Sequence, residues 1–206
     1  PLSGDLAAKD VAKRQPVKLA AMEAHFETHK GVGLWIGGIP NAETQTVEYG
    51  IQIPYLLSLL ATNNPFSEIK GLNDYPKEEW PPLLPVHLAF QVMVGIGTLL
   101  FGVSLLLLWN LWKKKDILEN RFILKLLALM TPLGVIAVEA GWIVTEVGRQ
   151  PWIIYGILKT KDSVTPMPGI EYILFFFAGL YLMLSLTVAW LMYRQFQLFI
   201  NKNQHA

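Results

Sequence analysis

The sequence predicts an all-α integral membrane protein with three transmembrane helices that follow a polar N-terminal region. Residues 81–112 contain no Asp, Glu, Lys or Arg over 32 positions, and residues 172–193 contain none over 22. A helix that crosses a bilayer needs about 20 such residues. The composition agrees, because 52% of the residues are hydrophobic and only 16% are charged, whereas soluble domains have about 25% charged residues.

The composition also excludes several classes of chemistry. Cysteine is absent, so this chain supplies no disulfide, no thiolate nucleophile and no Cys ligand to a metal. A net charge of +1 gives no electrostatic reason to expect a nucleic-acid partner. The chain starts Pro-Leu-Ser-Gly, without an initiator Met or a signal-peptide pattern. We therefore expect this start to lie inside a longer protein.

Residues 1–82 form the first predicted domain. Good helix formers, many of them Ala, run from residue 4 to residue 30 and end at Gly31 and Gly33. The apolar stretch 49–61 contains Pro54 and is too short to span a bilayer, which favours an interfacial or buried helix. The segment 63–82 is rich in Pro, Asn and charge, and predicts an irregular lead-in to the membrane.

Residues 83–206 form the second predicted domain, with spans at 85–112, 122–147 and 170–193 and a polar tail from residue 194. The cations of the first connection are Lys113, Lys114, Lys115 and Arg121, with Lys125 nearby, and those of the second are Arg149, Lys159 and Lys161. Positive residues favour the cytoplasmic side of short loops. This bias places the first connection and the C-terminus in the cytoplasm, and residues 1–82 outside it.

The second span carries two acidic residues, Glu139 and Glu146, at membrane depth. Such groups cost a few kcal/mol to insert, and they usually mark ion paths, proton relays or ligand sites. Seven residues apart on a helix, they share one face at a separation of about 10 Å. A proton relay or a carboxylate ligand would use such a row. Alternatively, Glu146 is an interfacial acid that pairs with Arg149.

The first span offers Met93, which is either a packing residue or an axial haem ligand, since a thioether can bind haem iron. Gln91 and His87, on the same span, are left open as haem contacts. His25 and His29 are four residues apart and could share a helical face, but the surrounding residues lack a zinc-site pattern. We interpret both histidines as surface residues.

Lys18 and Glu23 lie in an otherwise apolar stretch, five residues apart. On a helix this spacing separates them by about 140°, so they need not form a salt bridge. They belong either to a partly solvated amphipathic helix on the membrane or to a polar pair that holds a headgroup at its surface.

Four ordered blocks resemble subunit I of the cytochrome bd quinol oxidases. One block is GRQPW at 148–152, with Gly141, Trp142 and Glu146 before it and KDSVTP at 161–166 after it. The other three, in the order of the family, are QPVKLAAME at 15–23, IPYLLS at 53–58 and FQVMVG at 90–95. The resemblance covers the C-terminal half of that subunit.

The resemblance implies two b-type haems and one d-type haem, a quinol site on the extracytoplasmic face and reduction of O₂ to water. It implies that Met93 is an axial ligand of the low-spin b-type haem iron and that Glu146 is the ligand of the high-spin b-type haem iron. Trp142 and Arg149 resemble neighbours of the haem pair, with Arg149 suited to a propionate.

The same resemblance assigns residues to quinol and proton chemistry. Lys18 and Glu23 resemble the quinol-site pair of the external loop. Glu139 resembles a member of the interior acidic row near the d-type haem, which suits a proton path; together with Glu146 it is our candidate catalytic acid. Histidine ligands of the family come from its N-terminal half.

We therefore predict part of the catalytic subunit of a bd-type quinol:oxygen oxidoreductase that contributes to the proton gradient across a prokaryotic cell membrane. The expected partners are the N-terminal half of the subunit, a second large membrane subunit, a small single-span subunit, membrane quinol and the bilayer. Two alternatives remain. One is a haem-free proton-coupled transporter fragment with Glu139 and Glu146 as relay carboxylates, and the other is a non-catalytic membrane subunit in which these residues only pack.

Overall fold

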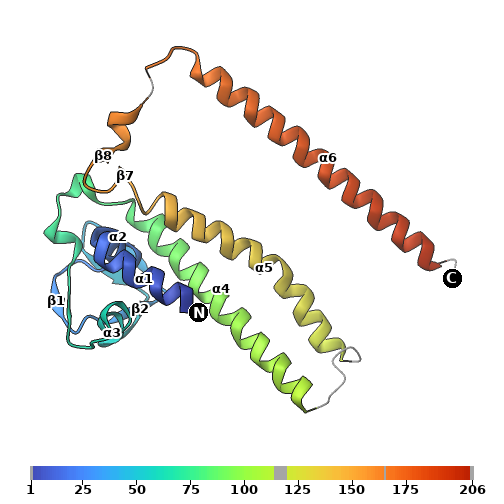
Figure 1. The fold of residues 1–206 in the computed structure, drawn as a ribbon. Coiled ribbons are helices and arrows are strands. Elements are labelled where there is room, and N and C mark those ends of the chain that lie inside the picture. Colours follow the sequence, from blue (N-terminus) through green and yellow to red (C-terminus); the bar gives the residue numbers. More distant parts are fainter. Residues whose placement is uncertain (1, 114–119, 165, 205–206) are drawn as a thin grey trace. The chain divides into compact units, whose positions relative to one another are not determined.

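The computed structural model describes residues 2–113, 120–164 and 166–204, and the described chain is mostly helical (Figure 1). It divides into two compact units, Pro1–Ser163 and Val164–Ala206. Lys114 and Lys115, which contribute to the predicted cytoplasmic loop, lie outside the described residues.

Among the described residues, three helices are long and apolar enough to cross a membrane, which confirms the predicted number of spans. They are α4 (Leu83–Trp112), α5 (Arg121–Glu146) and α6 (Ile170–Gln204). The first two agree with the predicted spans to within two residues. In the second compact unit, α6 continues eleven residues beyond Tyr193, so the expected polar tail is helical as far as Gln204.

Helices α4 and α5 pack side by side as an antiparallel pair (Figure 1). The first turn of α5 is capped by Asn120, whose Oδ1 accepts from the backbone N–H groups of Phe122 and Ile123 at 3.0 and 3.3 Å. Where the helices approach each other, an added Cβ at Gly141 would meet the Met93 sulfur at 3.3 Å. A glycine at this point of α5 therefore leaves room for the methionine side chain.

The N-terminal part of the chain, residues 2–82, is called the loop region below. It begins with α1 (Leu2–Arg14) and α2 (Pro16–Met22). The helix expected to reach residue 30 ends earlier. Ala24 has a left-handed φ of 49°, and the N–H of His25 bonds back to Ala20 O at 2.8 Å. These features turn the chain out of the helix before Gly31.

Short antiparallel strand pairs, which the sequence did not predict, occupy much of the rest of the loop region. They are β1 (His29–Lys30) with β6 (Glu68–Ile69), β2 (Leu34–Ile36) with β5 (Ile51–Ile53), and β3 (Ile39–Asn41) with β4 (Thr46–Glu48). The stretch 49–61 is therefore only partly helical: β5 comes first, Tyr55 adopts a left-handed conformation, and α3 (Leu56–Thr62) follows. Two 3₁₀ turns, η1 (Leu72–Asp74) and η2 (Lys77–Glu79), form the lead-in to α4.

The main core joins the loop region to the α4–α5 pair. Its buried side chains come from α2, from the first turns of α4 and from the last turns of α5, and include Val17, Ala20, Ala21, Val86, Ala89, Ala140 and Val144. After α5, the hairpin of β7 (Trp152–Ile154) and β8 (Leu158–Lys159) is tied to η2 by an ion pair from Lys159 Nζ to Glu79 Oε1 at 3.1 Å. The shared core holds α2 against the first turns of α4 and the last turns of α5.

Candidate functional site

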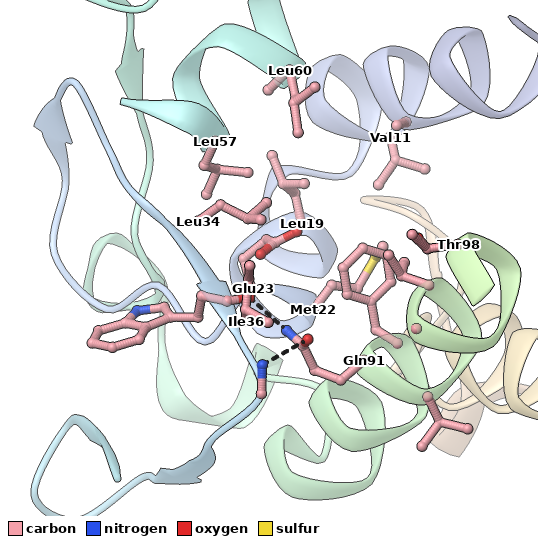
Figure 2. A pocket seen from close by; sticks show the side chains of 18 residues that line it. Val11, Leu19, Met22, Glu23, Leu34, Ile36, Leu57, Leu60, Gln91 and Thr98 are labelled. Atoms are coloured by element: carbon pink, nitrogen blue, oxygen red, sulfur yellow. Dashed lines mark hydrogen bonds between the residues drawn. The ribbon is translucent and has the colours of Figure 1, made fainter. Parts of the chain in front are cut away.

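A cavity of about 700 Å³ lies between the loop region and α4 (Figure 2). Its walls come from α1, α2, β2, α3 and α4, and most of the side chains that line them are apolar. The polar side chains at the wall are Glu23, Gln91 and Thr98. A mostly apolar cavity with a few polar groups is the usual form of a site for a small organic ligand.

Glu23 follows the last turn of α2, where its backbone N–H bonds to Leu19 O at 3.0 Å. Only 3% of the residue is exposed, and Oε2 has no hydrogen-bond partner among the described residues. Burial raises the pKa of this carboxyl from 4.5 to about 8. Glu23 is therefore an unpaired acid in the wall of an apolar cavity, available to a ligand that donates or accepts a proton.

Gln91 forms two hydrogen bonds to the backbone of the opposite wall. Its Nε2 donates to Trp35 O at 2.9 Å, and its Oε1 accepts from the N–H of Gly37 at 3.0 Å (Figure 2). Nearby, His87 is fully buried, and its Nδ1 donates to Met22 O at 2.8 Å. Both side chains, which the sequence left open, thus hold parts of the loop region to α4.

Lys18 does not join Glu23 at the cavity. It is buried on another side of α2, where its Nζ donates to Thr145 O at 3.3 Å near the end of α5. Burial, and then the nearby charge of Arg149, lower the pKa of Lys18. The absence of an ion pair between Lys18 and Glu23 among the described residues agrees with their angular separation on the helix.

Glu139, Trp142 and Glu146 lie at i, i+3 and i+7 and are exposed in this chain, on one face of α5. Trp142 and the Glu146 side chain are each 68% exposed. The interfacial pairing of Glu146 with Arg149 is present but long, with Oε1 and Nη2 3.8 Å apart. The carboxylate of Glu146 therefore keeps most of its capacity for another partner.

Met93 is half-buried on α4 and packs against the main core beside Gly141. It thus occupies the α4–α5 contact, whereas the acidic row lies on the open face of α5. Within the described ranges, no three His, Asp or Glu side chains cluster in a way that could hold a free metal ion. A metal bound at Met93 or Glu146 would therefore need most of its ligands from another source, as haem iron does from its porphyrin.

The prediction that His25 is a surface residue is wrong. The residue is 6% exposed, and its Nε2 lies 3.3 Å from Ile69 O, to which it donates. Burial lowers the pKa of His25 to about 4. The error came from extending the helix to residue 30, which would have put His25 and the exposed His29 on one face. No signal in the sequence indicated the strand that buries His25.

Together, the fold and the cavity define an integral membrane protein whose folded loop region borders an apolar cavity beside a transmembrane helix pair. The family described as cytochrome bd terminal oxidase subunit I matches residues 1–199. The chain belongs to this family, as a C-terminal part of the subunit.

Individual relatives agree with this assignment. The chain is 38% identical over 197 residues to a putative cytochrome bd menaquinol oxidase subunit I of Bacillus subtilis, covering 95% of this chain and 44% of the relative. It is 29% identical to a cytochrome bd ubiquinol oxidase subunit 1 of the same organism, covering 94% and 44%. The solved bd oxidase of Geobacillus thermodenitrificans matches with a TM-score of 0.80 and 40% identity, over 95% of this chain and 45% of that one. The chain thus spans less than half the length of these relatives, and the comparisons give no support to the haem-free transporter.

Proposed function

We propose that this chain is part of the catalytic subunit of a bd-type oxidase that oxidises membrane quinol and reduces O₂ to water. The observation that carries the proposal is the unpaired, buried carboxyl of Glu23 in an apolar cavity of about 700 Å³, in a chain of the bd oxidase family. A quinol has an apolar ring and tail with hydroxyl groups that must lose protons, and this cavity supplies matching chemistry for both parts.

At the quinol end, Glu23 would receive a hydroxyl proton as electrons leave the ring. Its raised pKa of about 8 makes the ionised carboxylate a stronger base than an ordinary glutamate. Lys18 would support the same site indirectly, by positioning α2 from the side that faces α5. Its bond to Thr145 O and its burial hold α2, and hence Glu23, against the end of α5.

The residues at the other end of the proposed electron path fit haem groups. Met93 offers a thioether beside the small Gly141, and Glu146 offers a carboxylate with a single long ion pair. Lys18 and Arg149 gather positive charge near Glu146, which suits the propionates of a haem. When bound, haem supplies the electron transfer and oxygen chemistry that side chains lack.

We assign Met93 to the low-spin b-type haem, and Glu146 to the high-spin b-type haem with Trp142 and Arg149 beside it. Glu139, on the same face of α5 as Glu146, would deliver protons toward the d-type haem. These assignments follow the resemblance, and they are supported by the open, acidic face of α5, because acids at membrane depth are buried against protein or a polar path rather than lipid.

This open face also supports the proposed partners. Ligands for the d-type haem, and the residue opposite Met93, would come from the N-terminal half of the subunit. A second large membrane subunit and a small single-span subunit would complete the complex in a prokaryotic cell membrane. The loop region would lie on the extracytoplasmic side, and the α4–α5 connection and the C-terminus on the cytoplasmic side, as the distribution of Lys and Arg favours.

A reduced-minus-oxidised visible spectrum of the detergent-purified complex tests the proposal. We expect b- and d-type haem bands, together with oxygen uptake driven by quinol. Glu146→Gln keeps the shape but removes the anionic ligand, so the high-spin b-type signal and turnover should both be lost. Met93→Leu should instead deplete only the low-spin signal.

The control variant is Glu43→Gln, at an exposed position of the loop region, which should keep every band and full oxygen uptake. A colourless preparation of the whole complex would refute the proposed function. Full haem content and normal uptake in the Glu146 variant would return that residue to its role as a partner of Arg149.

A further inference from the structure

The side-chain amide of Gln91 acts on the backbone of β2 as a neighbouring strand would. Both of its hydrogen bonds go to neighbouring groups along one edge, the carbonyl of Trp35 in β2 and the N–H of Gly37, the residue directly after β2. Because O of one residue and N–H of the residue two positions later point the same way in an extended chain, one planar amide can join both.

The strand that Gln91 holds is a wall of the cavity. Leu34, Trp35, Ile36 and Gly37 all line it, opposite residues of α2 and α3. Gly37 has a left-handed φ of 68°, which favours glycine and directs the chain away from β2 directly after the contact. On its other edge β2 pairs only with β5, itself three residues long. So short a strand pair depends on contacts from outside.

Gln91 also links this wall to the helix that carries Met93. The two residues are two positions apart on α4, so the amide fixes the distance between the cavity wall and the neighbourhood of the proposed haem ligand. Because its Nε2 and Oε1 are both engaged with backbone, Gln91 sets the position of the wall instead of leading the recognition of a ligand.

We propose that Gln91 is a positioning residue for quinol oxidation, which clamps the β2 wall of the cavity to α4 and thereby sets the fit of the quinol ring. This inference rests on the proposed function. Loss of the clamp should raise the KM for quinol while leaving kcat and the haem bands nearly unchanged, since no group that would exchange protons or electrons is removed.

The test compares Gln91→Leu and Gln91→Glu with the wild type in the complete oxidase complex. Leu removes both hydrogen bonds, so we expect the KM for quinol to rise about tenfold, the order given by two hydrogen bonds. Exchange of the Gly37 amide hydrogen should also accelerate about tenfold. The control is Asn110→Leu, which makes the same kind of substitution on α4 but outside the cavity, because the Asn110 Nδ2 donates to Leu106 O of its own helix at 2.8 Å. It should change neither quantity.

The glutamate variant gives a rescue that a merely structural role would not show. A protonated carboxyl both donates and accepts like the amide, whereas a carboxylate cannot donate to Trp35 O. The ratio of its KM to that of the wild type should therefore fall toward one as the pH is lowered.

Three results would overturn the clamp: an unchanged KM in Gln91→Leu, an unchanged Gly37 exchange rate, or a fall in kcat with a shifted low-spin haem band. The last would show that Gln91 acts on the haem. Amide exchange is measured without turnover, so it tests the clamp even if the wild-type complex oxidises no quinol, a result that would refute the proposed function separately.

Discussion

The carboxyl of Glu23 has a pKa of about 8 because it is buried without a partner. The ionised form, which would accept a proton from quinol under the proposed function, therefore accumulates only as the pH rises toward and past this value. We predict that kcat/KM for quinol rises from about pH 6.5 to about pH 8.5 in the wild type and is nearly flat in Glu23→Gln. An artificial donor that reduces the haems directly should show no difference between the two proteins. A rise of equal size in both would exclude Glu23 as the base.

The same pKa shift predicts how the stability of the protein depends on pH. Between pH 4.5 and about 8, folded Glu23 holds a proton that the unfolded chain releases, so stability falls as the pH rises through this window. Glu23→Gln removes this dependence, and its Tm relative to the wild type should increase from about pH 5 to about pH 8. A constant difference in Tm between Glu23→Gln and the wild type across this pH range would contradict the burial of the carboxyl.

For single residues, the sequence indicated which side chains are candidates for the site but not which of them lie in contact. The angular separation of Lys18 and Glu23 indicated that the two need not form an ion pair, and the described residues contain none between them. It could not show that one faces α5 and the other the cavity, because burial on two sides of α2 depends on α3 and β2, which fold back from later in the chain. The same limit produced the error at His25. The catalytic and haem-binding roles of Met93 and Glu146 stay predictions.

Among the secondary-structure elements, α3 is linked to the neighbouring loop segments by the buried hydroxyl of Ser58. Ser58 is fully buried; its Oγ accepts from the N–H of Val32 at 2.9 Å and donates to Ser67 O at 2.9 Å. We predict that Ser58→Ala lowers the local stability of the loop region by about 1–3 kcal/mol, because the N–H of Val32 is left buried without a partner. Hydrogen exchange at that amide measures the free energy of local opening.

A matched control for Ser58 is Ser104→Ala on α4. The Ser104 hydroxyl is exposed and donates to Leu100 O, one turn back in its own helix, at 2.9 Å. Its removal leaves no backbone group of the loop region unpaired, so exchange at Val32 should not change. If both variants accelerate that exchange equally, Ser58 is not the link between α3 and the strands.

The elements that could be predicted are those whose secondary structure is determined by their own local sequence. Each long helix exceeds the about 20 residues that a span requires and contains a strongly apolar stretch with few charges. The strands of the loop region are two or three residues long, too short for a period-2 pattern to be visible. They form because distant segments pair. The mostly apolar stretch 49–61 therefore predicts a single helix, whereas the structure has a strand followed by a helix.

For the whole molecule, the proposed function makes the row of Glu139 and Glu146 on α5 a proposed route for protons toward the site of oxygen reduction. We predict that Glu139→Gln keeps all haem bands but lowers oxygen uptake about 10²-fold or more, the order expected when a positioned proton-transfer group is lost. Glu139→Asp should retain much more activity, because it keeps the carboxyl. Steady-state oxygen consumption with excess quinol measures both.

The position of Glu139 on the open face of α5 allows a further check. Val138, the next residue along the helix, is also exposed, and Val138→Ala should leave oxygen uptake unchanged. If Glu139→Gln retains wild-type uptake, the proton path must be sought elsewhere in the complex.

The exposed acids of α5 also constrain how this protein is made. A helix with two carboxylates on one open face enters lipid at a cost of a few kcal/mol for each charge. It therefore inserts poorly until another protein surface covers that face. The residues proposed to hold a haem and move protons would thus delay maturation of α5 until its neighbours arrive. Substituting them with leucine would ease insertion of α5 ahead of its neighbours, and unassembled subunits should then accumulate in the membrane.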